Sequence, residues 1–195
     1  LSHGYVHHLD GSIETIDFPG GTDTQGYGVN DRGTVIGLYN DDQQATHAYA
    51  RIRGRFVDLD IPGGIATTPL SVNDSNEIVG EFEKTDGTVG YGFVRDASGH
   101  VTLHQAPGSL PQSTLFISAN NRGEVLGSWV DADGNYVNFL RKQAKYYAVA
   151  LPDSFGASFT SAQTLDDRND IVGYYVGPDG AVHGWLAWSQ GLHGE

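Results

Sequence analysis

The phrase "VNDRGTVIGLY" (residues 29–39) occurs four times in altered form in this 195-residue chain. The other copies are "VNDSNEIVGEF" (72–82), "ANNRGEVLGSW" (119–129) and "LDDRNDIVGYY" (165–175). The aligned Asn or Asp residues of the four copies are Asn30, Asn73, Asn120 and Asp166. A repeat of roughly 40 to 50 residues is typical of the four-stranded blades of a β-propeller. The sequence therefore predicts that the repeat is the unit of folding.

Each copy of the phrase predicts a strand, a tight turn and a second strand. Three residues after the Asn or Asp stands a Gly or an Asn, the two types that most readily adopt a left-handed backbone. These turn residues are Gly33, Asn76, Gly123 and Asn169. The second strand begins with two adjacent apolar residues, which indicates a strand covered on both faces by neighbouring sheets. The glycine that follows indicates close approach of another backbone, and it is Gly37, Gly80, Gly127 or Gly173.

Two more strands complete the period. One is a short aromatic motif, found as "HGYV" (3–6), "HAYA" (47–50), "YGFV" (91–94), "VNFL" (137–140) and "HGWL" (183–186). The other ends in an extended step before proline, found as "TIDFPGG" (15–21), "DLDIPGG" (58–64), "LHQAPGS" (103–109) and "AVALPDS" (148–154). No segment shows helical periodicity, and short strands between frequent turns indicate an all-β protein. The prediction is a small β-propeller of four blades, each with about four antiparallel strands.

The boundaries of the repeats follow from the same alignment. We expect a single repeat domain over residues 1–195, with units at about 3–40, 46–83, 90–130 and 135–176 and an extra terminal strand at 182–188. Because the aromatic strand has a fifth copy, a five-bladed propeller with one partial blade is an alternative. An open β-solenoid is a second one. The extra strand could also mediate a homodimer through its free edge.

The combination of "VNDRGTVIGLY", "HAYA" and "IDFPGG" resembles the HAF repeat, which is found in bacterial proteins thought to be extracellular. The resemblance covers nearly the whole chain. It implies a repeated β architecture and an extracellular or periplasmic location, and it supplies no catalytic residues. The chain begins at Leu1 and contains no Met, so we expect a processed or excised segment from which an export signal has been lost.

Composition excludes several classes of partner and chemistry. The chain has 24 acidic and 11 basic residues and a formal charge of −13, which repels nucleic acid and anionic membrane surfaces. It lacks an apolar run near the roughly 20 residues of a membrane-spanning helix. Without cysteine it has neither thiolate nucleophiles nor Cys-ligated metals. We expect no cofactor.

Residues that break the repeat are the candidates for chemistry. His104 stands in a column that is otherwise apolar, and Glu81 stands where other repeats have Leu, Ser or Tyr, so these two are the candidate acid and base. Four further residues are candidate ligand-binding groups, namely Gln163, Tyr174, Gln105 and Tyr91. One column of the aromatic motif contains three histidines that a closed ring could bring toward its axis as metal ligands, His3, His47 and His183. The same column also holds Tyr and Val, so a metal site is not predicted.

Three functions fit these observations. The first is an exported, non-enzymatic propeller that binds a small molecule, a glycan or a protein at one face of the ring. The second is an enzyme, either a hydrolase, a lyase or a cyclase, that uses the acid and base groups of an asymmetric pocket. The third is a structural repeat from a larger surface protein. The absence of a recognisable catalytic motif favours the binding module.

Overall fold

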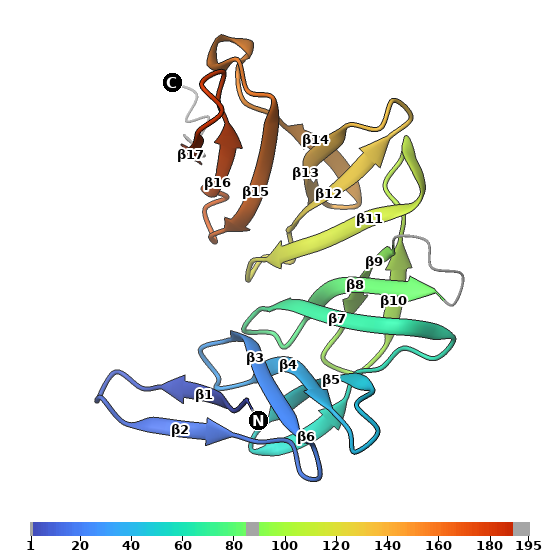
Figure 1. The fold of residues 1–195 in the computed structure, drawn as a ribbon, viewed down its shortest axis with the longest axis vertical. Coiled ribbons are helices and arrows are strands. Elements are labelled where there is room, and N and C mark those ends of the chain that lie inside the picture. The colour runs from blue at the N-terminus through green and yellow to red at the C-terminus, as the bar shows by residue number, and fades with distance from the viewer. Residues whose placement is uncertain (1, 85–89, 189–195) are drawn as a thin grey trace.

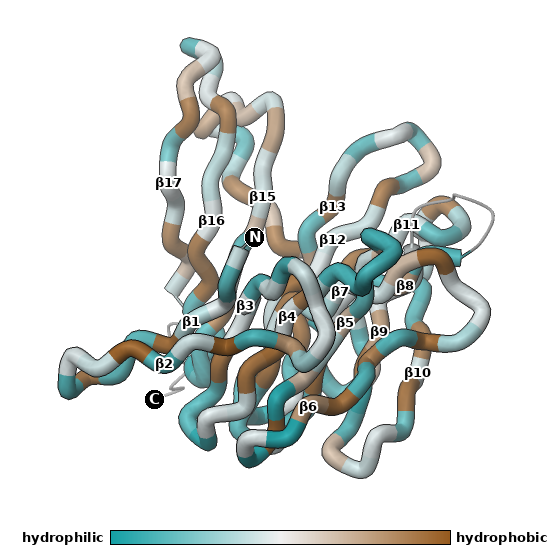
Figure 2. Tube along the Cα trace, turned by 60° about the horizontal axis from the view of Figure 1, so that its bottom comes forward, coloured by the Kyte–Doolittle hydropathy of each residue, from teal (hydrophilic) through white to brown (hydrophobic). Residues whose placement is uncertain are grey.

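The computed structural model describes residues 2–84 and 90–188, and its regular structure consists almost wholly of β-strands (Figure 1). A 3-10 turn at Asp153–Phe155 is the only helical element in these residues. Hydrophobic and hydrophilic residues alternate along many of the strands (Figure 2). The prediction of an all-β protein is confirmed.

Four antiparallel sheets follow one another along the chain, and each is one blade. Blade 1 contains β3 (Asp23–Val29), β4 (Val35–Asn40), β5 (Thr46–Ile52) and β6 (Arg55–Asp58). Blade 2 contains β7 (Gly64–Val72), β8 (Ile78–Lys84), β9 (Tyr91–Arg95) and β10 (Val101–His104). Blade 3 contains β11 (Ser109–Ala119), β12 (Val125–Asp131), β13 (Tyr136–Lys142) and β14 (Lys145–Val149). Blade 4 contains β15 (Phe159–Leu165), β16 (Ile171–Val176) and β17 (Val182–Ala187).

The blades are arranged as a small four-bladed β-propeller, as the repeat predicts. The first strands of neighbouring blades lie against one another, β3 with β7, β7 with β11 and β11 with β15. The first strand of each blade is therefore the inner one, and the fourth is the outer one. Figure 1 shows the blades following one another around an arc. Each blade is a meander of hairpins, which differs from the single-stranded coils of a β-solenoid.

One copy of the aromatic motif lies outside the four blades, and it is the first one, "HGYV" at 3–6; the copy at 182–188, predicted as an extra terminal strand, instead forms β17 within blade 4. The "HGYV" copy contains β1 (Gly4–His7), which pairs with β2 (Ile13–Ile16) in a separate two-stranded sheet beside β3. Within residues 2–84 and 90–188, blade 4 forms no strand pairs with β1, β2 or blade 1. Among these residues, no strand of blade 4 packs extensively against β1, β2 or blade 1 either, so one face of blade 4 is left without a covering sheet.

The sheets begin and end at different points of the repeat from the predicted units. They span residues 23–58, 64–104, 109–149 and 159–187, so each blade begins with the first strand of the repeated phrase. The predicted units instead begin at the aromatic strand. The hydrogen-bonded sheets break after the fourth strand because the Pro-containing step there removes a backbone donor from the ladder.

The turn inside the repeated phrase forms as predicted. Asn30 Oδ1 accepts hydrogen bonds from the backbone N–H of Arg32 at 3.1 Å and of Thr34 at 2.9 Å. Gly33 has a φ of 74°, and Asn76 at the same place in blade 2 has a φ of 59°. The side chain thus closes the turn, and the following residue adopts the left-handed conformation that Gly and Asn tolerate.

The glycine column marks a close approach between strands, also as predicted. A Cβ atom on Gly37 would overlap the carbonyl oxygen of Gln25 in the first strand and would lie 3.0 Å from the ring of Tyr49 in the third. Tyr49 is fully buried. Glycine at this position therefore makes room for the aromatic residue that fills the interior of each blade.

Most of the hydrophobic core lies between blades. Ile36, Val79 and Leu126 occupy the same place in blades 1, 2 and 3, and each is fully buried in a cluster shared with the next blade. Val172 occupies this place in blade 4 and is 40% exposed. The difference follows from the missing cover over the outward face of blade 4.

Candidate functional site

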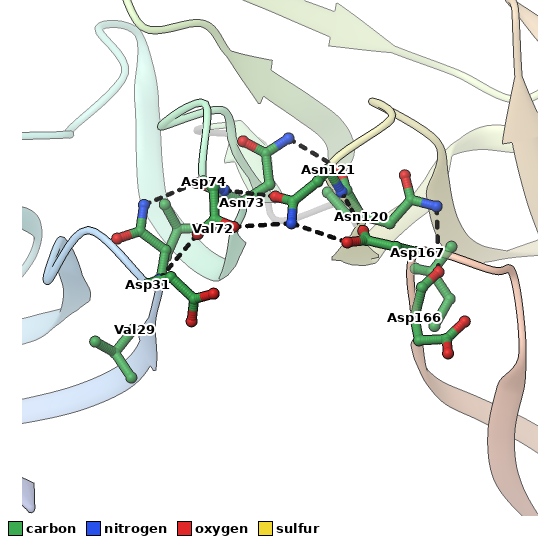
Figure 3. A pocket seen from close by; sticks show the side chains of 12 residues that line it. Val29, Asp31, Val72, Asn73, Asp74, Asn120, Asn121, Asp166 and Asp167 are labelled. Atoms are coloured by element: carbon green, nitrogen blue, oxygen red, sulfur yellow. Dashed lines mark hydrogen bonds between the residues drawn. The ribbon is translucent and has the colours of Figure 1, made fainter. Parts of the chain in front are cut away.

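A ladder of polar residues joins the blades at the turn after each first strand (Figure 3). An Asn side chain of one blade donates through Nδ2 to a backbone carbonyl of the next blade. The distances are 2.8 Å from Asn30 to Asn73, 3.0 Å from Asn73 to Asn120 and 3.3 Å from Asn120 to Asp166. Asp166 accepts the hydrogen bonds of its own turn but has no amide donor for a further blade.

A second row of the ladder lines a cavity of about 280 Å³ at the inner end of the blades. The backbone N–H of Asp31 donates to Asp74 Oδ1 at 2.9 Å, and that of Asp74 donates to Asn121 Oδ1 at 2.7 Å. Asn121 Nδ2 donates to carboxylate oxygens of Asp74 at 2.8 Å and of Asp167 at 3.0 Å. Because these polar groups bond to one another, the row sets the spacing of the blades.

The three histidines of the metal hypothesis lie apart, each with its own carboxylate. His3 Nδ1 lies 2.7 Å from Asp17 Oδ1, and His47 Nδ1 lies 2.6 Å from Asp60 Oδ2. His183 Nε2 lies 3.2 Å from Asp179. His47 and His183 are on the third strands of their blades, and His3 precedes β1 of the separate two-stranded sheet, so none of them is on the strand nearest the axis. Among the residues described here, no three His, Cys, Asp or Glu side chains form a group that could hold a metal ion.

The pairing of histidine with aspartate explains why blade 3 lacks both residues. In blade 1, His47 comes from the third strand and Asp60 follows the end of the fourth. In blade 3 the corresponding residues are Val137 and Ala150, so both partners are absent together. A hydrogen bond to the Asp60 carboxylate raises the pKa of His47. The column therefore holds an imidazole–carboxylate pair that links adjacent strands.

His104 and Glu81, the candidate acid and base, lie on either side of a glycine in blade 2. Gly92 pairs with Glu81 across β8 and β9 and with His104 across β9 and β10. A Cβ on Gly92 would lie 2.7 Å from the ring of Phe116, which belongs to blade 3. The Phe116 ring thus occupies the space between the two candidates. The register brings the residues onto one row of the sheet, with an aromatic ring from the next blade between them.

Burial shifts the pKa of both residues. Burial, together with the nearby Arg141 guanidinium, lowers the pKa of His104 to about 4. The His104 ring lies 5.3 Å from that of Phe116, and its Nε2 lies 3.0 Å from Thr102 Oγ1. Burial raises the pKa of Glu81, whose Oε1 accepts a long hydrogen bond of 3.4 Å from the Gly90 N–H. Each group is therefore shifted toward its neutral form.

The four candidate ligand-binding residues fall into two separate pairs. Tyr91 lies under the ammonium group of Lys84, with 4.9 Å between Nζ and the ring centroid, and Gln105 is exposed after the fourth strand of the same blade. Gln163 and Tyr174 are on blade 4, where Gln163 Nε2 donates to Ser161 Oγ at 2.8 Å. Ser161 pairs directly with Tyr174. The structure thus brings Gln163 and Tyr174 into one neighbourhood.

A groove between blades 3 and 4 contains two exposed aromatic rings. Its volume is about 320 Å³, and it lies between the start of β13 and the start of β15. Tyr136 is 62% exposed and Phe159 is 37% exposed. Their rings meet edge to face, with centroids 5.9 Å apart. The remaining lining consists of small and polar residues, Gly134, Asn135, Ala157, Ser158 and Thr160. We call this the aromatic groove.

The sequence contains a signal for these rings. Tyr136 occupies a column that otherwise holds Ser2, Thr46, Gly90 and Val182. Phe159 occupies a column that otherwise holds Asp23, Ala66 and Ser113. Each is the only aromatic residue in its column, a signal that a comparison of polar residues in apolar columns does not detect.

The equivalent groove between blades 1 and 2 has different chemistry. Its volume is about 230 Å³, and Thr46 and Ala66 stand where the aromatic groove has Tyr136 and Phe159. The imidazole of His47 is its only aromatic ring. The remaining lining is Ala45, Asp60, Ile61, Gly64, Ile65 and Thr67. We call this the histidine groove.

Comparisons with known proteins give no family for this chain. No family model matches it, and no curated protein matches it. Among solved structures, a mutant of AofleA from Arthrobotrys oligospora is 14% identical with a TM-score of 0.47, and the match covers 91% of this chain and 58% of that one. The BP39L lectin from Burkholderia pseudomallei is 13% identical with a TM-score of 0.48, covering 91% and 56%.

A mutant of the Aleuria aurantia lectin in complex with α-methyl-L-fucoside is 10% identical with a TM-score of 0.38, covering 93% of this chain and 85% of that one. The chain thus spans less than two thirds of the first two structures. Within the residues described, the structure contains no helix long and apolar enough to cross a membrane.

Proposed function

We propose that this protein is a non-enzymatic carbohydrate-binding module, and that its binding site is the aromatic groove. The observation that carries this proposal is the pair of exposed rings, Tyr136 and Phe159, at the junction of two blades. An exposed aromatic ring offers an apolar face against which the C–H groups of a sugar ring can pack. A small number of convergent polar groups then fixes the orientation of the ligand.

The polar groups of the groove suit the hydroxyl groups of a sugar. Asn135 contributes an amide and Ser158 a hydroxyl, and both residues are exposed. An amide and a hydroxyl can each donate and accept hydrogen bonds, as a sugar hydroxyl does. Because the formal charge of the chain is −13, uncharged saccharides are favoured over anionic ones.

The groove favours binding over acid–base catalysis. Its only titratable side chain is Tyr136, and it contains no carboxylate, histidine or lysine. The acid and base candidates, His104 and Glu81, are on blade 2 and are absent from its lining. General acid–base catalysis requires such groups within hydrogen-bond reach of the reacting atoms. A saccharide in this groove would be held without being cleaved by residues of its lining.

The test is a binding screen with matched variants. Thermal shift and calorimetry would use glucose, galactose, mannose, N-acetylglucosamine and L-fucose, with sialic acid as an anionic probe, and short oligomers of the neutral sugars. We expect at least one neutral saccharide to bind and sialic acid not to bind. Tyr136→Ala and Phe159→Ala should each weaken binding by about tenfold or more, as truncation of an aromatic anchor commonly does.

Thr46→Ala is the matched control, because Thr46 occupies the place of Tyr136 in the histidine groove. It should leave saccharide affinity unchanged. Binding that survives both aromatic substitutions would place the site elsewhere. If no neutral saccharide shifts the melting temperature at millimolar concentration, the carbohydrate proposal is overturned, since a ligand of the folded state raises stability by mass action.

An extracellular or periplasmic location, which the resemblance to HAF repeats implies, belongs to the same proposal. A glycan-binding module is useful where it meets extracellular glycans. Fractionation of the source cells, with detection by an antibody against the chain, would decide this point.

A further inference from the structure

The outward face of blade 4 carries an aromatic ring close to the aromatic groove. Tyr174 is 37% exposed on β16, and its ring centroid lies 6.1 Å from that of Phe159. Phe159 in turn lies 5.9 Å from Tyr136. The three rings form a continuous row that starts in the groove and continues onto the uncovered face of blade 4.

A polar pair stands beside Tyr174. Ser161 is directly opposite Tyr174 in the strand ladder, and its hydroxyl accepts a hydrogen bond of 2.8 Å from Gln163 Nε2. Gln163 is exposed, at the point where an irregularity between Ala162 and Thr164 interrupts the pairing of β15. The hydroxyl and the amide together offer hydrogen-bonding groups next to an aromatic ring, which is the same combination that the groove contains.

A glycine leaves open space on the other side of Tyr174. Gly184 pairs with Tyr174, and among the residues that the structure describes a Cβ placed on Gly184 would have one neighbour within 4 Å, the Gly173 carbonyl oxygen at 3.9 Å. At the equivalent Gly92 in blade 2, the ring of Phe116 from the next blade fills this place at 2.7 Å. In blade 4 the space beside Tyr174 is therefore accessible to a ligand.

We propose that Tyr174, Ser161 and Gln163 form a second subsite, and that the ligand of this protein is an oligosaccharide extending from the aromatic groove over Phe159 to Tyr174. This inference rests on the proposed function and adds the size and shape of the ligand. Successive ring centroids are about as far apart as neighbouring sugars in a chain, so each ring packs against one sugar.

The orientation of the rings selects the shape of the chain. The planes of Tyr136 and Phe159 differ by 73°, and those of Phe159 and Tyr174 differ by 40°. A flat, ribbon-like glycan requires rings that are nearly parallel. The row therefore fits a glycan whose sugars turn relative to one another, as in α-1,4-linked glucans, better than a flat β-1,4-linked ribbon.

The experiment measures affinity against chain length by isothermal titration calorimetry. The probes are malto-, cello-, manno- and N-acetylchito-oligosaccharides of one to four units. In a series whose sugars turn relative to one another, with the malto-oligosaccharides as reference, we expect affinity to rise at least about tenfold between one and three units. Tyr174→Ala and Gln163→Ala should remove most of this gain and leave the affinity for the monosaccharide unchanged.

Tyr147→Ala is the control, because Tyr147 is a half-exposed tyrosine on β14 away from the row. Circular dichroism and melting temperature verify folding, and Gln163→Ala provides a second reading should Tyr174→Ala fail to fold. Equal affinity for one and three units in every series would overturn the second subsite while leaving the proposed function intact. A larger gain in affinity with chain length for the cello-oligosaccharides would overturn the inference that the row prefers a glycan whose sugars turn relative to one another.

The absence of any saccharide binding would instead overturn the proposed function itself. Light scattering of the same samples tests the competing occupant of this face, a second copy of the chain. A dimer that Tyr174→Ala dissociates would show that the face is a protein interface and would overturn the subsite.

Discussion

The aromatic groove and the histidine groove stand at equivalent places between blades, yet only a few residues give them different chemistry. Tyr136 and Phe159 in one correspond to Thr46 and Ala66 in the other. Val137 replaces His47, and the carboxylate partner of the histidine is lost with it. The repeat therefore determines where a groove lies, and substitutions at its rim determine what it can hold.

The two blade junctions also differ at a buried position two residues along the third strand from Thr46 and Tyr136. Ala48 of blade 1 is fully buried and belongs to an apolar cluster shared with blade 2. At the same place in blade 3, Asn138 is 3% exposed and bonds across the junction to blade 4. Its Nδ2 donates to Thr160 O and Oγ1, both at 3.1 Å, and its Oδ1 accepts the Ala162 N–H at 3.0 Å. At this one position, the first junction has an apolar residue and the other has a buried, hydrogen-bonded amide.

The largest effect should come from removing this amide. Asn138→Ala leaves the buried N–H of Ala162 without its acceptor, and an unsatisfied buried polar group costs about 1 to 3 kcal/mol. With the loss of the two donated bonds, we expect the free energy of unfolding to fall by about 2 to 4 kcal/mol. Urea denaturation followed by tryptophan fluorescence measures it.

Asn135→Ala is the control for this prediction. Asn135 is exposed on the same hairpin, and its side-chain amide bonds only to Asp131 at 3.2 Å. The change should stay within about 0.5 kcal/mol. If Asn138→Ala lowered the free energy of unfolding by as little as Asn135→Ala, the amide would not hold blade 3 to blade 4. The contrast between Ala48 and Asn138 would then have no energetic consequence.

A transplant of the rings tests whether the rim determines binding. The double variant Thr46→Tyr with Ala66→Phe places the two aromatic residues at the equivalent positions of the histidine groove. If the rings carry saccharide binding, the number of sites per chain should rise from one to two, with the second weaker because the other lining residues differ. Titration calorimetry at high protein concentration gives the stoichiometry. An unchanged stoichiometry in a folded variant would mean that the rings alone do not make a site.

The features predicted from the sequence are those contained within one repeat. The tight turn at Asn30 and Gly33 and the close approach at Gly37 each depend on residues of a single hairpin, so four copies of the pattern were enough to predict them. The aromatic groove instead joins Tyr136 of one blade to Phe159 of the next. No pattern within a repeat reports which residues meet across a junction.

The same limit explains the catalytic candidates and the histidine column. His104 and Glu81 share a row of blade 2, but only the packing of blade 3 shows that Phe116 lies between them. The histidines likewise do not meet at the axis in the described residues, because the aromatic motif forms the third strand of each blade and His47 faces its own carboxylate, Asp60.

The smallest predicted effect is a pH dependence that belongs to the histidine groove alone. His47 is held by Asp60 at 2.6 Å and by Asp41 at 3.3 Å, and the hydrogen bond to Asp60 is the main reason that its pKa is raised. A raised folded pKa stabilises the protein at pH values below the unfolded pKa of about 6.5. This stabilisation is lost as the pH rises through the folded pKa.

We therefore expect His47→Ala to lower the free energy of unfolding below pH 6 by up to about 1 kcal/mol, and to lower it by less at pH 8, since partly exposed ion pairs contribute little. Urea denaturation between pH 5 and pH 8 measures this change. Val137→Ala, at the equivalent position of blade 3, should alter stability equally at all these pH values because no titratable pair stands there. Parallel stability curves for the wild type and His47→Ala would show that the imidazole–carboxylate pair is not charged in the folded protein.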